Sequence, residues 1–152
     1  MMFPQQDADN LEETDNIQFF TEEIDFNLPD QNSVRKWIMD IIQNEGQSLE
    51  ALTFVFCSDE YLHKMNVEYL DHDTLTDVIT FPYSDPPKIE GDIFISIDRI
   101  EENAKTFEVP FLKELHRVII HGVYHLCGYG DKSPEEEKMM REKEEFALNL
   151  KG

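Results

Sequence analysis

Apolar residues recur along the chain at two spacings, one typical of helices and the other typical of strands. In residues 34–42 they return every three or four positions, which predicts one buried face of a helix. That helix would begin near Asp30 and stop at Gly46, because glycine readily adopts the left-handed conformation that ends many helices. Similar patterns predict further helices over residues 58–69, 98–107, 111–127 and 134–148.

Two of these helices begin with specific capping signals. Ser58 precedes two acidic residues and has the form of an N-cap, and the helix that follows is expected to bury Leu62, Met65 and Tyr69. Ser133–Glu136 has the form of a capping box with a proline at the first helical position.

Four segments rich in β-branched and aromatic residues predict strands, near residues 17–26, 51–57, 77–82 and 93–97. Together with four or five helices, they indicate an α+β domain with a mixed sheet of about four strands packed by helices. Residues 1–16 are polar, acidic and poor in aliphatic side chains, so we expect a flexible leader there. Residues 17–152 would then form one domain.

Composition and charge narrow the functional classes. No run of about 18 apolar residues occurs, and no basic region precedes an apolar stretch, so neither a membrane helix nor a secretory signal is expected. With only two cysteines, a cytoplasmic protein is the expectation. The net charge of −20 disfavours general affinity for nucleic acid, which depends on cations. However, residues 1–30 contain nine acidic residues and no lysine or arginine, so a local substrate site elsewhere stays open.

The most informative stretch runs from His121 to Asp131. Two histidines four residues apart share one face of a helix, so His121 and His125 can reach the same ion. Gly128 then ends the helix and turns the chain back, which lets the carboxylate of Asp131 approach that ion. Three protein ligands leave a fourth position for water, as in catalytic zinc sites. The sequence therefore predicts one zinc ion per chain, which would lower the pKa of its water and polarise a substrate oxygen.

Histidine pairs at this spacing are often incidental, but the surroundings argue against that interpretation here. The helix is otherwise apolar, and an unpaired imidazole in such a setting would be costly. The spacing resembles that of the metzincin proteases, which carry a glutamate as general base directly after the first histidine. Gly122 occupies that position, which disfavours ordinary peptide hydrolysis.

Two neighbouring residues on the same helix are expected to lie outside the metal site. His116 is about 140° round the helix from His121, which predicts a surface or capping residue. Cys127 is about 200° round from His125, which predicts a packed thiol that faces away from the ion.

Several sequence blocks resemble the YbeY family of metal-dependent endoribonucleases. The stretch His121–Tyr129 is similar to the family signature HGxLHLxGYDH, and Thr76–Pro82 is similar to its TDVLSFP segment. Gly91–Ile93 matches the GDI that begins the family's next strand, and Asn66–Tyr69 also fits. The blocks occur in the family's order and cover residues 60–145, more than half of the chain.

This resemblance implies a zincin-like fold with the metal site on a central helix. It also implies a single-strand-specific, zinc-dependent endoribonuclease that acts in ribosomal RNA maturation, at the 16S rRNA 3′ end, and in ribosome quality control. Its partners would be ribosomal RNA and a ribosomal subunit or ribosomal protein. Asp77 either lines the metal cleft or satisfies backbone groups at a strand end; the resemblance favours the first role, without assigning a general base.

Two positions depart from the family pattern. The family commonly has a third histidine where this chain has Asp131, and a carboxylate can still ligate zinc while adding a negative charge. It usually has an arginine, a natural bidentate phosphate contact, where this chain has Leu70. His72 and Lys132 are the candidates to replace that contact.

Two other functions therefore stay open. One is a non-catalytic, zinc-containing ribosome-assembly factor, which Leu70 favours. The other is a metal hydrolase of a non-nucleic substrate such as a peptide, which Gly122 disfavours.

Overall fold

The computed structural model describes residues 16–70 and 76–151 of the 152-residue chain, so nearly all of the predicted leader lies outside the described residues. The elements in chain order are β1 (Ile17–Glu22), α2 (Gln31–Asn44), β2 (Ser48–Cys57), α3 (Asp59–Leu70), β3 (Val78–Pro82), β4 (Lys88–Ser96), α4 (Ile97–Phe107), α5 (Phe111–Cys127) and α6 (Pro134–Lys151).

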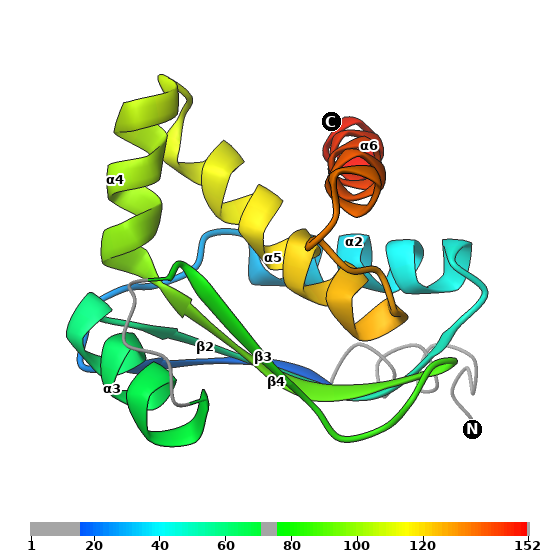
Figure 1. Cartoon of the computed structure of the whole chain (residues 1–152), viewed down its shortest axis with the longest axis horizontal. Coiled ribbons are helices and arrows are strands. Elements are labelled where there is room, and N and C mark those ends of the chain that lie inside the picture. The colour runs from blue at the N-terminus through cyan, green and yellow to red at the C-terminus, as the bar shows by residue number, and fades with distance from the viewer. Residues whose placement is uncertain (1–15, 71–75, 152) are drawn as a thin grey trace, which may run out of the picture.

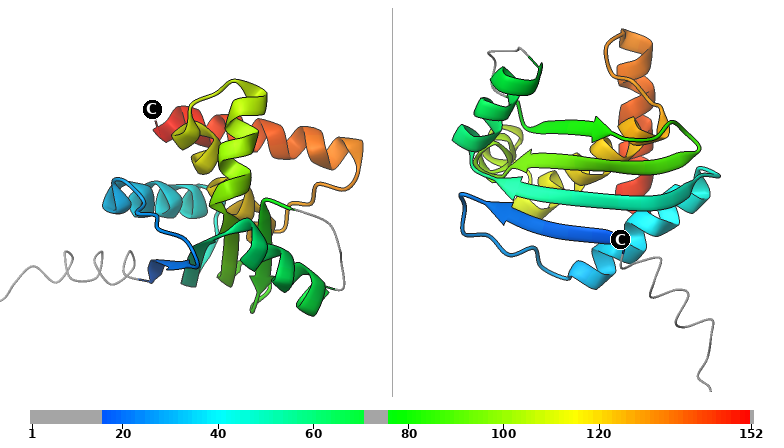
Figure 2. Two further views of the ribbon diagram at one scale, coloured as in Figure 1. Left: turned by 90° about the vertical axis from the view of Figure 1, so that its left-hand side faces the viewer. Right: turned by 90° about the horizontal axis from the view of Figure 1, so that it is seen from below.

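The strands form one mixed sheet in the order β1-β2-β4-β3. β2 pairs in parallel with both β1 and β4, whereas β3 pairs antiparallel with β4 at the edge. Helices α2, α5 and α6 lie over one face of the sheet, and α3 lies against the other (Figure 1). The view from below in Figure 2 shows all four strands side by side with α3 at one end. The predicted α+β architecture with a mixed four-stranded sheet is confirmed.

Helix α5 is the centre of the domain. It contacts strands β3 and β4 as well as helices α2, α4 and α6. Its backbone comes so close to the sheet that a Cβ atom on Gly122 would lie 2.9 Å from Cγ2 of the fully buried Ile93. The helix that carries the two histidines is therefore buried centrally, as predicted.

The ends of the helices follow the capping signals. Gly128 directly follows α5 and Gly46 lies two residues after the end of α2, and both have positive φ angles, 111° and 70°. Ser133 and Glu136 exchange reciprocal hydrogen bonds, because the Glu136 amide donates to Ser133 Oγ and the Ser133 amide donates to Glu136 Oε1. Ser58 Oγ likewise accepts from the amide of Tyr61.

One burial prediction for α3 is wrong. Leu62 is buried, but Tyr69 is 65% exposed. Its ring packs edge-on against Phe81, with the ring centroids 6.3 Å apart. Because Phe81 belongs to the edge strand β3, it covers only one side of the tyrosine.

Across the described ranges, no helix combines the length and the apolar character needed to cross a membrane.

Candidate metal centre

The structure brings the three predicted ligands together. His121 and His125 lie one turn apart on α5, and the chain reverses after Gly128 so that Asp131 returns to the same point. Oδ2 of Asp131 lies 3.3 Å from Nε2 of His121 and 3.3 Å from Nε2 of His125. One ligand atom from each residue lies within 4.8 Å of the others, so these three side chains could hold a metal ion.

The hydrogen bonds on the far side of each imidazole suit metal binding. Nδ1 of His121 lies 2.7 Å from Oε2 of Glu144, and Nδ1 of His125 lies 2.8 Å from the carbonyl oxygen of Tyr129. Both partners accept hydrogen bonds, so Nδ1 of each ring donates; when the rings are neutral, as metal ligation requires, each Nε2 lone pair faces Asp131. A cation between the two lone pairs and the carboxylate would stabilise this arrangement. Two imidazoles and a carboxylate form a donor set that suits zinc.

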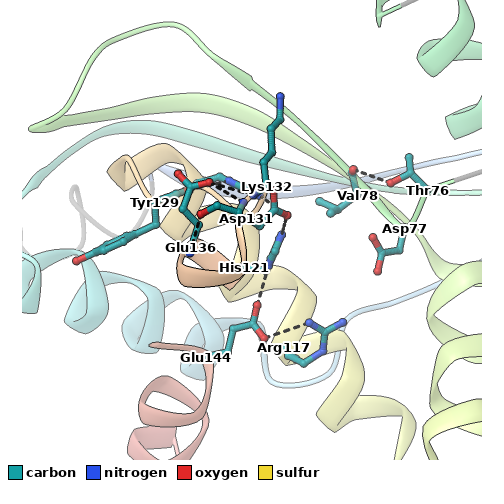
Figure 3. Close-up of polar contacts among 12 residues, drawn as sticks. Thr76, Asp77, Val78, Arg117, His121, Tyr129, Asp131, Lys132, Glu136 and Glu144 are labelled. Atoms are coloured by element: carbon teal, nitrogen blue, oxygen red, sulfur yellow. Dashed lines mark hydrogen bonds and ion pairs between the residues drawn. The ribbon is translucent and has the colours of Figure 1, made fainter. Parts of the chain in front are cut away.

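An ion-pair network supports the imidazole of His121. Nε and Nη2 of Arg117 donate to the two oxygens of Glu114 over 2.9 Å and 2.8 Å, and Nη1 donates to Oε1 of Glu144 over 3.1 Å. Both glutamates are buried, and Figure 3 shows the chain of contacts from Arg117 through Glu144 to His121. Our sequence reasoning missed these residues. The seven-residue spacing between Glu114 and His121, which places both on one face of α5, was the available signal.

A second network holds the loop that joins α5 and α6. The hydroxyl of Tyr129 donates to Oε1 of Glu45 over 2.7 Å, and Nζ of Lys143 donates to Oε2 of the same carboxylate over 2.8 Å. The Lys143 ammonium also lies 5.1 Å from the centre of the Tyr129 ring. These contacts fix Tyr129, whose carbonyl oxygen orients His125.

A cavity of about 220 Å³ adjoins the candidate centre, between α5 and α6. Its lining includes His121 and Asp131 together with Glu137 and Arg141 from α6. Arg141 is exposed and forms no ion pair or hydrogen bond with any described residue. It is therefore a cation next to the three candidate metal ligands, and its charge is available to a bound substrate.

Asp77 directly precedes β3 and faces this region. Its carboxylate accepts a hydrogen bond from Nδ2 of Asn103 over 3.3 Å, and Figure 3 shows it on the same side as Arg117 and His121. Burial raises the pKa of Asp77, while Arg117 and His121 oppose that rise. A site-lining role for Asp77 stays a prediction.

The positions considered for a phosphate contact do not lie together at the candidate metal centre. Leu70 is the last residue of α3, on the opposite side of the sheet from α5, and it does not line the cavity. Lys132 follows Asp131 directly, but its exposed side chain extends away from Glu144 (Figure 3). His72 lies outside the described residues.

The two other residues singled out on α5 have different outcomes. Cys127 is buried, and burial raises the pKa of its thiol to about 12, so the prediction of a packed thiol is confirmed. The prediction of a surface or capping position for His116 is wrong. Its ring packs edge-on against Trp37 of α2 at a centroid distance of 5.7 Å, because α2 covers this side of α5.

Comparisons with known proteins agree on one family. A family model described as endoribonuclease YbeY matches residues 16–151. A relative named endoribonuclease YbeY from Amoebophilus asiaticus is 52% identical over 134 residues, which are 88% of this chain and 91% of the relative. A relative of the same name from Flavobacterium psychrophilum is 50% identical over 86% of this chain and 94% of its own. The fold is similar to the solution structure of TM1509 from Thermotoga maritima, with a TM-score of 0.65, 26% identity, and coverage of 89% of this chain and 88% of the other.

Proposed function

Because the chain belongs to the endoribonuclease YbeY family, we propose that it is a zinc-dependent endoribonuclease that cleaves single-stranded RNA during ribosomal RNA maturation. The observation that carries the proposal is the convergence of His121, His125 and Asp131 on one point beside a cavity. We further propose that these residues hold one zinc ion per chain. We propose that this cleavage takes place in the cytoplasm, during processing of the 16S rRNA 3′ end and in ribosome quality control.

The residues of the chain would prepare the reaction by holding and orienting its components. His121 and His125 present Nε2 lone pairs, because the protons on their Nδ1 atoms are held by Glu144 and by the carbonyl of Tyr129. A bound zinc ion would supply Lewis acidity, which lowers the pKa of a ligated water and offsets negative charge on the phosphate. Asp77 would line the substrate path, where its carboxyl group could exchange a hydrogen bond with the RNA.

The distribution of charge shapes how RNA would bind. Arg141 lines the cavity without a carboxylate partner among the described residues, so it is the cation that we expect to contact a phosphate. The overall charge of −20 nevertheless opposes binding of free RNA. We therefore propose that a ribosomal subunit or ribosomal protein holds the RNA near the site at a high effective concentration.

Gly122 weighs against a peptidase. A glutamate at this position would begin at a Cβ atom only 2.9 Å from the buried side chain of Ile93, so its first atoms would collide with the sheet. The base that the metzincin proteases place at this point would require α5 or the buried side chain of Ile93 to shift.

An RNA cleavage assay tests the proposal. Purified protein is stripped with a chelator, reloaded with zinc, and incubated with a single-stranded RNA and with a duplex of the same sequence. We expect cleavage of the single strand only, and only with metal, while His125→Ala is inactive. Equal cleavage by His125→Ala would contradict the proposal, and zinc-loaded protein that binds ribosomal subunits but cuts no RNA would favour the assembly factor.

A further inference from the structure

Helix α6 supplies a buried carboxylate to the back of the metal centre. Oε2 of Glu144 lies 2.7 Å from Nδ1 of His121, and only 4% of the glutamate is exposed. No other carboxylate in the described ranges makes an ion pair with that nitrogen. His125 differs, because its Nδ1–H donates to the uncharged backbone carbonyl of Tyr129 and not to a carboxylate.

The position of Glu144 is fixed from its other side. Its second oxygen, Oε1, accepts from Nη1 of Arg117 over 3.1 Å. Arg117 is itself held by a bidentate pair with Glu114, which raises the pKa of the guanidinium and keeps it charged. The two oxygens of Glu144 thus serve different partners, one the arginine and one the imidazole (Figure 3).

We propose that Glu144 is a positioning residue of the metal centre, which sets the orientation and proton position of His121 and strengthens it as a ligand. A carboxylate on Nδ1–H holds the imidazole with its Nε2 lone pair toward the ion and makes that nitrogen a better donor. Arg117 keeps Glu144 in place for this task. The proposal rests on the ligand set of the proposed function, and extends it to residues that touch neither metal nor substrate.

The alternative is that Glu144 only stabilises the packing of α6 on α5 through Arg117. A purely structural ion pair would affect the free energy of unfolding but would leave the affinity for metal unchanged once the protein is folded. Metal affinity therefore separates the two roles.

The test compares Glu144→Gln with Glu137→Gln. The control glutamate lies on the same helix and lines the same cavity, but its carboxylate bonds to neither histidine. Both substitutions remove one negative charge near the centre, but Glu137 is exposed and Glu144 is buried, so solvent screens the two charges differently. The spectrum of bound Co²⁺, which reports ligand geometry, is therefore the deciding measurement. We expect Glu144→Gln to weaken zinc binding, measured by chelator competition, by about 10- to 100-fold. Glu137→Gln should change it by less than about threefold, and the visible spectrum of bound Co²⁺ should change only in Glu144→Gln.

Each outcome decides the proposal. If Glu144→Gln keeps the parent's Co²⁺ spectrum, or binds zinc as tightly as Glu137→Gln, Glu144 does not position His121. The His121→Ala variant keeps the two proposals apart: if it retains zinc, the ligand set itself is wrong, whereas its loss of zinc leaves only Glu144 in question.

A measurement on the unsubstituted protein covers the case in which Glu144→Gln does not fold. Nitrogen-15 NMR of the histidine rings reports which nitrogen of His121 carries the proton in the metal-free chain. We expect the proton on Nδ1. A neutral ring with its proton on Nε2 would overturn the proposal.

Discussion

His125 lies in the last turn of helix α5 and Asp131 lies in the loop that follows it, yet Nε2 of the histidine is 3.3 Å from Oδ2 of the aspartate. Two local signals fix this distance. Gly128 turns the chain at φ 111°, and the capping box at Ser133 starts α6 soon afterwards. The short connection between α5 and α6 thus returns the carboxylate of Asp131 to the two imidazoles.

Substitutions at Asp131 test its role as third ligand. Asp131→Ala removes one of three donors, so we expect zinc affinity to fall by more than about 100-fold, beyond the usual effect of losing a supporting residue. Asp131→His should retain the metal, because imidazole also suits a tetrahedral site. Isothermal titration of both variants measures this. Unchanged affinity in Asp131→Ala would place the third ligand elsewhere.

Leu70→Arg tests the phosphate contact inferred from the family. Leu70 is 39% exposed at the end of α3, so an arginine can be accommodated there. We expect tighter binding of single-stranded RNA, with a gain that shrinks as salt rises, because the new contact is electrostatic.

Leu70→Gln is the matched control for this experiment, since it adds polarity without charge. Fluorescence anisotropy with labelled RNA at low and high salt gives both affinities. If Leu70→Arg binds RNA no better than Leu70→Gln at low salt while zinc stays bound, position 70 lies outside the RNA path.

Gly122→Ala tests the close approach of α5 to the sheet. The added methyl group would lie 2.9 Å from Cγ2 of Ile93, and this isoleucine is fully buried. We expect a net loss of about 1–3 kcal/mol in the free energy of unfolding, despite the better helix propensity of alanine. Denaturant unfolding of the metal-free protein measures it; equal or greater stability would show that the helix can move off the sheet at little cost.

His116 should make stability depend on pH. Burial, with a smaller contribution from Lys151, lowers the pKa of His116 from 6.5 to about 4, while Asp30 opposes the shift. Between these two values the unfolded chain binds a proton that the folded chain does not, so His116 lowers stability as the pH falls from about 6.5 to about 4.

The matched variant is His116→Gln, which cannot titrate. Unfolding of the metal-free protein is followed across that pH range, so that metal release does not contribute. We expect a smaller loss of stability on acidification in His116→Gln than in the parent. Parallel curves would show that His116 is protonated as easily in the folded chain as in the unfolded one.

The elements, and the convergence of His121, His125 and Asp131, were predictable because their signals are local. The histidine spacing, Gly128 and the position of Asp131 all lie within one short segment, which brings the three side chains to the same point. Glu144 was not predictable from sequence, since its contact with His121 depends on how α6 folds back over α5.

The errors at Tyr69 and His116 have a related cause. Periodicity indicates which face a residue occupies, but not what covers that face. The edge strand β3 leaves Tyr69 open on one side, while Trp37 of α2 covers His116.

Zinc content shows directly whether the candidate centre holds the metal. The parent protein and a variant carrying both His121→Ala and His125→Ala are equilibrated with a small molar excess of zinc, dialysed, and measured by elemental analysis. Loss of both imidazoles leaves only Asp131 of the three donors, which cannot retain zinc through dialysis. We predict close to one zinc per chain in the parent and none in the folded double variant; a full complement of zinc in the double variant would contradict the account.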